Sequence, residues 1–301
     1  MIKASLMNLK YRLADLVDLK TSQFMDIQGV ESVCLTLGPY RNLTTLTASA
    51  LFLHPNCQVL NHAGSRIYSN KQINFLLDYN KTKLDRFIQF AIKISSKGQK
   101  GAMGGSITHS HAFDSKYGMK DVYTKKGLEL TKDQIKCLFW KESHLTSNLI
   151  RQKNIELGDI FEKESRLRFL LPIRNPLDCA LSNLTTGHVK NFMELDKGAT
   201  IVEVVQAVLD EIFWFAELKE RFPDRFFYYF EHEISKEMLV GLAEFLQLEA
   251  DESWITNALC VMKSNSHYEH DSELVCFYRD YVSDKGSRFP SLSKGLLHFI
   301  D

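Results

Sequence analysis

An arginine and two threonines lie in a short polar stretch between two apolar segments near the start of the chain. The apolar run 33–37 is broken at Gly38, and Arg41, Thr44 and Thr45 follow before apolar residues resume at helical spacing. This pattern predicts a buried strand, a tight loop and a helix. A helix N-terminus offers unpaired backbone N–H groups and a positive dipole end, so this stretch could bind a phosphate. An ordinary strand-to-helix turn with a solvated arginine fits the same residues.

An arginine and a serine eight residues apart form a second candidate anion site. Arg174 follows the apolar run 168–173, and Ser182 belongs to the helical pattern that follows it. Asn175 is a suitable N-cap and Pro176 a suitable first helical residue. A guanidinium at the strand end and a hydroxyl about two turns into the helix could hold another phosphate. Taken alone, an exposed arginine and a serine on a helix surface are commonplace.

Two histidines follow predicted strands and are candidates for a general base. His62 comes directly after the short strand predicted at 58–61, and His144 comes a few residues after the strand predicted at 135–140. Histidine suits proton transfer because its unperturbed pKa lies near neutrality. A histidine that merely caps the end of a strand is the structural alternative for each, and His62 is slightly favoured as the base.

The elements that must position these residues alternate between strands and helices. Strands are predicted at 33–37, 58–61, 135–140, 168–173 and 225–230, and the main helices at 70–94, 201–218 and from Ser235 onward. This alternation predicts an α/β fold with a mostly parallel sheet flanked by helices on both faces. Ligands of such sheets bind beyond the carboxyl ends of the strands, where all the candidate residues above fall.

The chain is expected to form a single domain over residues 1–301, because no linker rich in Pro, Gly or Ser divides it. Residues 1–27 fit an N-terminal amphipathic helix, and the glycine-rich stretch 95–123 fits a flexible, lid-like insertion on the substrate side. Ordinary surface disorder is the alternative for this insertion. It contains His109 and His111, which lack an evident third metal ligand, so no metal site is expected.

The overall composition argues against several partners. The 37 basic residues balance 37 acidic ones, so bulk charge gives no reason to expect nucleic acid as a partner. No apolar run of about twenty residues occurs, and a membrane span is not expected. The six cysteines lack metal-binding spacing and are read as reduced core residues, which favours a cytoplasmic location.

Four stretches, taken in order, resemble the sulfotransferases that use 3′-phosphoadenosine 5′-phosphosulfate (PAPS). GPYRNLTTL at 38–46 looks like the 5′-phosphosulfate loop of that family, and LFLHPNCQVLNHA at 51–63 is similar to its continuation in bacterial and tyrosylprotein-type members. IRNPLDCALSN at 173–183 looks like the 3′-phosphate motif. FFYYFEHEISKEMLVGLAEFLQLE at 226–249 resembles the late strand, acidic turn and helix. The resemblance therefore extends from about residue 31 to about residue 250.

The resemblance implies a P-loop NTPase-like three-layer architecture and an enzyme that transfers a sulfuryl group from PAPS to a hydroxyl of a small-molecule or glycan acceptor, such as a carbohydrate, a lipid or a small alcohol. It implies no metal. The residues that would bind the donor are Arg41, Asn42, Leu43, Thr44, Thr45, Arg174, Ser182, Lys285 and Gly286. The residues that would take part in catalysis are Arg41 and either His62 or His144.

The chain departs from the family pattern at three places. Asn42 stands where the family usually has serine, and Leu43 where it usually has glycine. A leucine adopts the backbone conformations of glycine only with strain, so either the loop is remodelled or donor affinity is reduced. Lys285-Gly286 is a reduced form of the C-terminal RKG-type element, and a solvated surface turn is its alternative.

Two other functions are compatible with the same pattern. The first is a small-molecule kinase with a P-loop-like fold, although the GxxxxGK[ST] sequence is absent. The second is a non-catalytic protein that retains the fold and binds a ligand or partner, for which Leu43 is the main indication.

Overall fold

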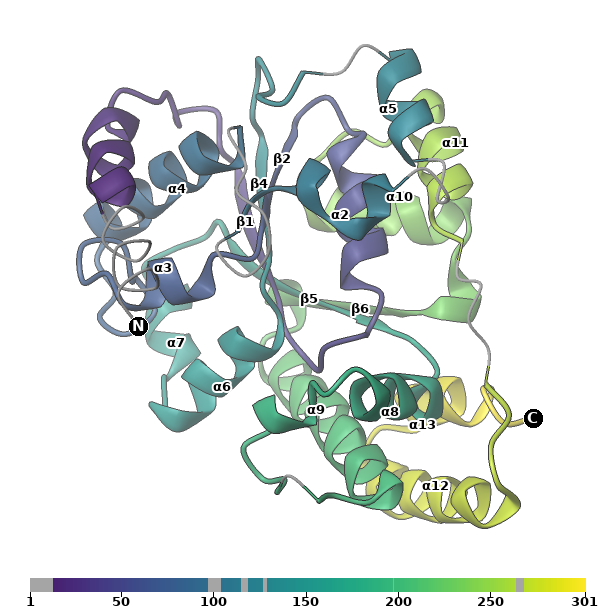
Figure 1. Cartoon of the computed structure of the whole chain (residues 1–301). Helices are drawn as coiled ribbons and strands as arrows, with labels where there is room; N and C mark the ends of the chain where they lie inside the picture. Colours follow the sequence, from purple (N-terminus) through teal and green to yellow (C-terminus); the bar gives the residue numbers. More distant parts are fainter. Residues whose placement is uncertain (1–12, 97–103, 115–118, 127–128, 197, 264–267) are drawn as a thin grey trace, which may run out of the picture.

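Six strands form one sheet at the centre of the structure, a computed structural model that describes residues 13–96, 104–114, 119–126, 129–196, 198–263 and 268–301 (Figure 1). The sheet order is β3-β2-β4-β1-β5-β6. All neighbouring strands pair in parallel except β3, which is antiparallel to β2. The strands are β1 (Ser32–Thr36), β2 (Cys57–Asn61), β3 (Gly105–Ser106), β4 (Cys137–Lys141), β5 (Leu167–Ile173) and β6 (Phe226–Phe230).

The connections that follow β1 and β4 run to opposite sides of β1, and this leaves a crevice at the carboxyl end of β1. From β1 the chain continues to β2, on the far side of β4, whereas the connection from β4 crosses to β5 on the other side of β1. Every residue of β1, β2 and β4 is buried. Strands buried on both faces consist of nearly continuous apolar runs, which explains why the sequence pattern identified them.

Helices cover both faces of the sheet, which confirms the predicted α/β class (Figure 1). One core cluster joins the sheet to α2, α10 and α11, and a second joins it to α4, α8, α9, α12 and α13. The helices are α2 (Thr44–Phe52), α3 (Gly64–Tyr68), α4 (Lys81–Ser95), α5 (Met119–Lys126), α6 (His144–Gln152), α7 (Leu157–Phe161), α8 (Pro176–Thr185), α9 (Ile201–Arg221), α10 (Lys236–Phe245), α11 (Glu252–Val261), α12 (Ser272–Lys285) and α13 (Pro290–Leu297).

Side-chain caps fix the start of several helices at the predicted residues. The side chain of Asn175 accepts a hydrogen bond from the backbone of Leu177, and Pro176 is the first residue of α8. Ser235 caps α10 in the same way, by accepting from the backbone of Met238. Such caps satisfy amide groups that have no partner within the helix.

The helix predicted at 70–94 begins later than expected. Residues 70–80 form turns, and α4 starts at Lys81. The side chain of Asn80 accepts a hydrogen bond from the backbone of Thr82, which stabilises the start of the helix at this point. Apolar residues of the preceding turns, such as Ile73 and Leu76, are nevertheless buried. The spacing of these apolar residues therefore reflects their burial and does not indicate a helix.

The stretch 95–123 is more ordered than a loop where the structure describes it. Residues 104–114 contain β3 and two short 3-10 turns, and α5 starts at Met119. Residues 97–103 and 115–118 of this predicted lid lie outside the described residues. Of the predicted N-terminal helix 1–27, residues 13–22 are helical, and residues 1–12 lie outside the described part.

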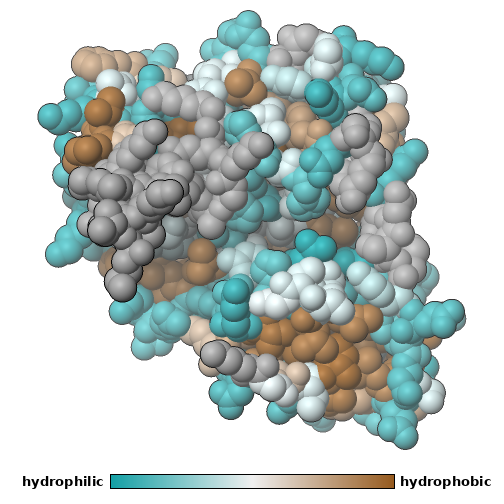
Figure 2. Space-filling view, in the orientation of Figure 1, coloured by the Kyte–Doolittle hydropathy of each residue, from teal (hydrophilic) through white to brown (hydrophobic). Residues whose placement is uncertain are grey.

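The face of the molecule in Figure 2 is mainly hydrophilic, with a hydrophobic area where Figure 1 draws the layer of α8, α9 and α12. Within the part of the chain that the structure describes, no helix combines the length and the hydrophobicity needed to cross a membrane.

Candidate functional site

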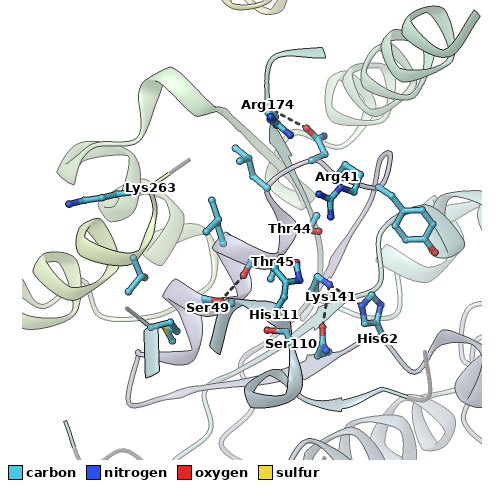
Figure 3. Close-up of a pocket in the computed structure, with 18 of the residues that line it drawn as sticks. Arg41, Thr44, Thr45, Ser49, His62, Ser110, His111, Lys141, Arg174 and Lys263 are labelled. Atoms are coloured by element: carbon cyan, nitrogen blue, oxygen red, sulfur yellow. Dashed lines mark hydrogen bonds between the residues drawn. The ribbon is translucent and has the colours of Figure 1, made fainter. Parts of the chain in front are cut away.

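A cavity of about 600 Å³ opens at the carboxyl ends of the central strands (Figure 3). Four strand ends contribute to its lining: the loop after β1, Asn61 at the end of β2 with His62 after it, Lys141 at the end of β4, and Arg174 after β5. Further lining residues come from 109–112, Met119, His188 and 260–263. The sheet therefore brings together most of the residues that the sequence analysis placed at strand ends. Arg41, Asn42, Leu43, Thr44, Thr45, His62 and Arg174 all line this cavity.

The loop between β1 and α2 has an unusual backbone. Gly38 has a φ of 91°, Arg41 of 65° and Leu43 of 56°, all in the left-handed region. At Gly38 a Cβ atom would come within 2.3 Å of the side chain of Leu171, so only glycine fits. These turns direct the chain across the sheet edge into α2, whose first N–H groups have no acceptor within the helix. Thr44 and Thr45 stand at this end of α2 and line the cavity.

Leu43 adopts the conformation that a glycine would favour. It is the N-cap of α2 with φ 56° and ψ 0°, and its side chain does not form a capping hydrogen bond. A left-handed conformation costs a leucine roughly 1–2 kcal/mol. The side chain is 8% exposed, so its burial offsets part of that cost. The loop therefore keeps a glycine-like path at Leu43 and carries a buried leucine there.

Asn42 joins the two candidate anion sites. Its Oδ1 atom accepts a 2.8 Å hydrogen bond from the backbone N–H of Arg174. Its buried Nδ2 group has no hydrogen-bond partner among the described residues. A buried donor without a partner is costly, and a bound anion would satisfy it. Asn42 thus links the loop after β1 to the end of β5, and it offers a hydrogen-bond donor at the edge of the cavity.

Helix α8 supports the same loop from behind. The side chain of Asn183 donates a 2.7 Å hydrogen bond to the backbone carbonyl of Tyr40. The Nε atom of Arg41 donates a 2.8 Å hydrogen bond to the hydroxyl of Ser182. Ser182 is buried and does not line the cavity, so in this structure it contacts the arginine of the other motif.

Arg174 is a buried guanidinium at the upper edge of the cavity in Figure 3. Its Nη2 atom lies 3.4 Å from Oδ2 of Asp178, one turn further along α8. The other oxygen of Asp178 lies 2.7 Å from Nε2 of His270. The aromatic ring of Tyr268 lies 5.8 Å from the guanidinium carbon. Arg174 is therefore held in place by a carboxylate that has a second partner.

His62, Lys141 and Glu142 form a connected polar group next to the loop. The ammonium of Lys141 lies 3.1 Å from Nε2 of His62, and 3.2 Å from Oδ1 of Asn61. Because an ammonium only donates hydrogen bonds, Nε2 accepts and the ring proton is on Nδ1. Nδ1 faces Glu142, whose Oε1 atom is 4.0 Å away. Burial, with the nearby Arg41, lowers the pKa of Lys141 to about 8 despite the opposing effect of Glu142.

The backbone around His62 is fixed by close contacts. His62 and Ala63 have φ values of 56° and 80°, so the chain makes two left-handed turns after β2. The indole of Trp140 donates a 2.6 Å hydrogen bond to the carbonyl of His62. Glu142 accepts a 2.6 Å hydrogen bond from the backbone of Gly64. Such strain in a packed environment is common at functional sites.

His144 lies behind the cavity and does not line it. The left-handed backbone of Ser143 (φ 49°) turns the chain so that His144 begins α6 with a fully buried ring. Its Nε2 donates to the carbonyl of Asn191 at 2.8 Å. Burial, with the nearby Arg151, lowers the pKa of His144 to about 4. The structure thus separates the two histidines that the sequence left as alternatives.

Lys285 and Gly286 lie away from the cavity. They stand at the end of α12, and neither lines the cavity. A Cβ atom on Gly286 would come within 1.7 Å of the hydroxyl of Ser293, so packing against α13 explains this glycine. Lys285 lies 5.9 Å from the ring of Tyr281.

Several lining residues were not among the predicted site residues: Tyr40, Lys141, His188 and Lys263. Lys141 could have been selected, because it ends an apolar strand at the edge where ligands bind. His188 follows α8, and its place beside Tyr40, with ring centroids 5.5 Å apart, depends on how that helix packs. His109 and His111 line the cavity too. Within the described residues, no group of three side chains could hold a metal ion.

Comparison with known proteins gives distant structural similarities. No family model matches the sequence, and no curated protein matches it. Mouse sulfotransferase SULT7A1 complexed with PAP is similar at a TM-score of 0.45 and 9% identity, covering 94% of this chain and 92% of that one. A sulfotransferase from Alicyclobacillus acidocaldarius gives 0.42 and 11%, covering 88% and 96%. Sulfotransferase STF9 from Mycobacterium avium gives 0.42 and 13%, covering 86% and 78%. At TM-scores below 0.5 these similarities do not assign a function, which has to be argued from the cavity itself.

Proposed function

We propose that the protein is a sulfotransferase that moves a sulfuryl group from PAPS to a hydroxyl acceptor. The observation that carries this proposal is the bond between Asn42 and Arg174, which fixes two cationic sites at one cavity. A nucleotide with phosphates on both the 5′ and 3′ positions needs two such sites. Arg41 and the start of α2 would hold the 5′-phosphosulfate, and Arg174 the 3′-phosphate. Apolar lining from Leu43, Leu46 and Val261 suits a purine ring.

The polar group at His62 supports the transfer step. In this reaction the acceptor oxygen forms a bond to sulfur while the bond between sulfur and the 5′-phosphate oxygen breaks. His62 would take the acceptor proton at Nε2, with Lys141 moving from that atom to the leaving oxygen. Arg41, Lys141 and the amides of α2 would stabilise the charge on the leaving phosphate. His144 has no role in this step because its ring is buried behind Tyr40.

Titration calorimetry with adenosine 3′,5′-bisphosphate (PAP) tests the proposal. Binding is expected, and no binding at roughly millimolar ligand would reject the function. Arg174→Ala should weaken PAP binding by about tenfold or more, because a charge-assisted contact to the 3′-phosphate is lost. Adenosine 5′-phosphate lacks that phosphate and should bind both proteins similarly. Arg288→Ala, at an exposed arginine paired with Glu220, is a control that should change neither affinity.

Titration with ATP and Mg²⁺, and an assay of PAP release from PAPS, distinguish the alternatives. A kinase would bind ATP with Mg²⁺ more tightly than PAP, and the described cavity lining contains no carboxylate to hold the metal. A non-catalytic protein would bind PAP without releasing PAP from PAPS in the presence of any acceptor. Leu43 remains the reason to test this second case.

We also propose a reducing compartment, such as the cytoplasm, and one domain over residues 1–301. All six cysteines lie in the described residues and none forms a disulfide, which supports the first proposal. The expectation that all six are core residues was wrong for Cys260 and Cys276, which are exposed. Strands and helices from both halves of the chain build one sheet and its two covering layers, which supports the second.

A further inference from the structure

The proposed donor does not account for all the basic groups at the cavity. Its phosphates would use Arg41, Arg174 and the amides of α2. Four imidazoles and the ammonium of Lys263 remain, and the described lining contains no aspartate or glutamate. The histidines are His62, His109, His111 and His188. A cavity that binds only a neutral acceptor would not need a lining with several basic side chains and no acidic ones.

The imidazoles come from separate elements that are fixed against one another. The segment with His109 and His111 is anchored by β3, which pairs with the end of β2. A Cβ atom on Gly104 would come within 2.2 Å of the backbone of Ala63, so this segment is pressed against the turn at His62. Figure 3 draws His111 and Ser110 with Lys141 and His62 around the cavity that all four residues line. His109 and His111 thus line the same cavity as the proposed base, His62.

His188 lies next to Tyr40, with the ring centroids 5.5 Å apart. Its Nδ1 is 2.6 Å from the hydroxyl of Thr186, which orients the ring. Burial lowers the pKa of His188, and the cations Arg41 and Lys190 lower it further. The ring is therefore uncharged at neutral pH and can contribute to anion binding only as a hydrogen-bond donor. The carboxylate of Glu142 lies behind His62, buried and bonded to Gly64.

From this distribution we infer that the acceptor is a hydroxyl compound that also carries a negative charge, as in a sugar acid or a sugar phosphate. The inference rests on the proposed function, because it assigns the other half of the same cavity. An anion next to the reacting hydroxyl would be attracted to the ammonium groups of Lys141 and Lys263, and it could accept hydrogen bonds from the imidazoles. A neutral phenol or steroid would instead require extended apolar walls.

Matched acceptors test the inference in the complex with PAP. Methyl glucuronide and methyl glucoside differ only at C6, where the first has a carboxylate and the second a hydroxymethyl group. Glucose 6-phosphate and glucose form a second pair, which differs by a phosphate. Calorimetric titration of the protein saturated with PAP should give the charged member of one pair an affinity about tenfold higher, or ~1.4 kcal/mol. Raising NaCl from roughly 50 to 500 mM should reduce this preference, because the charges are partly exposed.

His188→Gln should reduce the preference for the charged acceptor several-fold and leave the weak binding of its neutral partner unchanged. His298→Gln, at a histidine on the C-terminal side of α13, is the matched control and should have no effect. Inorganic phosphate alone separates a general anion site from recognition of the sugar. Equal affinities within both pairs, binding of phosphate alone as tightly as the sugars, or no binding of any acceptor would overturn the inference. Loss of PAP binding would instead reject the proposed function.

Discussion

The Nε atom of Arg41 donates a 2.8 Å hydrogen bond to the hydroxyl of Ser182, so the two motifs that the sequence suggested for two phosphates are in direct contact. Ser182 is 1% exposed and lies on α8, beneath the loop. This contact ties the guanidinium of Arg41 to α8. If Arg41 holds the 5′ end of the proposed donor, Ser182 would act on that end through Arg41.

Ser182→Ala therefore distinguishes two roles for the serine. If Ser182 positions Arg41, PAP and adenosine 5′-phosphate should both lose affinity by the same factor, about five- to tenfold, for loss of one hydrogen bond to a charged group. If the serine instead binds the 3′-phosphate, as the family resemblance implies, only PAP should weaken. Thr185→Ala, at an exposed hydroxyl on the same helix, is the control and should leave both affinities unchanged.

Lys141 predicts a pH dependence of donor binding. Its pKa is lowered to about 8, so the ammonium that attracts phosphate is lost as the pH rises above that value. PAP affinity should be constant below pH ~7.5 and fall above pH ~8, by at most tenfold per pH unit for one proton. Calorimetry from pH 7 to 10 measures this. Lys141→Arg stays charged and should remove the fall; an unchanged fall in this variant would assign it to another group.

Titration of Lys141 should affect folding stability in the opposite direction to donor affinity. Between the folded pKa of about 8 and the ordinary value of 10.5, the unfolded chain binds more protons at Lys141 than the folded one. The free energy of unfolding should therefore rise with pH in this window. Below the folded pKa of about 8, titration of Lys141 should not change the free energy of unfolding. Urea titrations of the wild type and Lys141→Met, compared at pH 7 and 9.5, isolate the contribution. A difference that is independent of pH would contradict the buried ammonium.

Leu43 gives a test of backbone strain. Replacing it with alanine or glycine removes the same buried side chain, but only glycine adopts φ 56° without cost. Leu43→Gly should thus be more stable than Leu43→Ala by ~1 kcal/mol in urea denaturation, although both should be less stable than the wild type. In the interior of α2 the order should reverse, and Ala50→Gly should lose ~1 kcal/mol. Leu43→Ala as the more stable variant would argue against the left-handed loop.

Local signals in the sequence were sufficient for much of the fold. The break at Gly38 and the cap at Asn175 are readable because each depends on its own neighbours in the chain. The strand order was not readable, because pairing of β1 with β4 joins residues about a hundred positions apart. Only the start of the helix predicted from Asn70 was wrong, because the apolar residues of 70–80 are buried at helical spacing without forming a helix.

The site was predictable only in part. Both His62 and His144 follow strands, so the sequence did not distinguish them. The left-handed turn at Ser143 buries His144 at the start of α6, and a serine does not predict such a turn. Gly286 resembled part of a phosphate motif, but its role in the structure is close packing against Ser293. The contact between Arg41 and Ser182 depends on how α8 packs against the loop, which no local pattern encodes.

Gly64 tests whether Glu142 holds the turn that carries His62. A Cβ atom on Gly64 would come within 2.7 Å of the carboxyl carbon of Glu142 and would displace the carboxylate from the backbone N–H that it accepts from. Gly64→Ala should destabilise the protein by ~1–3 kcal/mol, because the buried carboxylate loses its partner. Gly198→Ala, where no atom lies within 4 Å of the added carbon, is the control and should change stability by less than ~0.5 kcal/mol.

A double-mutant cycle separates this clash from any general effect of alanine at the start of α3. If the carboxylate is the obstacle, Gly64→Ala combined with Glu142→Ala should cost less than the sum of the two single changes, by about 1 kcal/mol or more, because the two sites are in contact. NMR of the His62 ring should show the same environment in Gly64→Ala and Glu142→Ala, since both remove the carboxylate from Nδ1. Strictly additive stabilities, or a His62 signal that Gly64→Ala leaves unchanged, would show that Glu142 does not hold this turn.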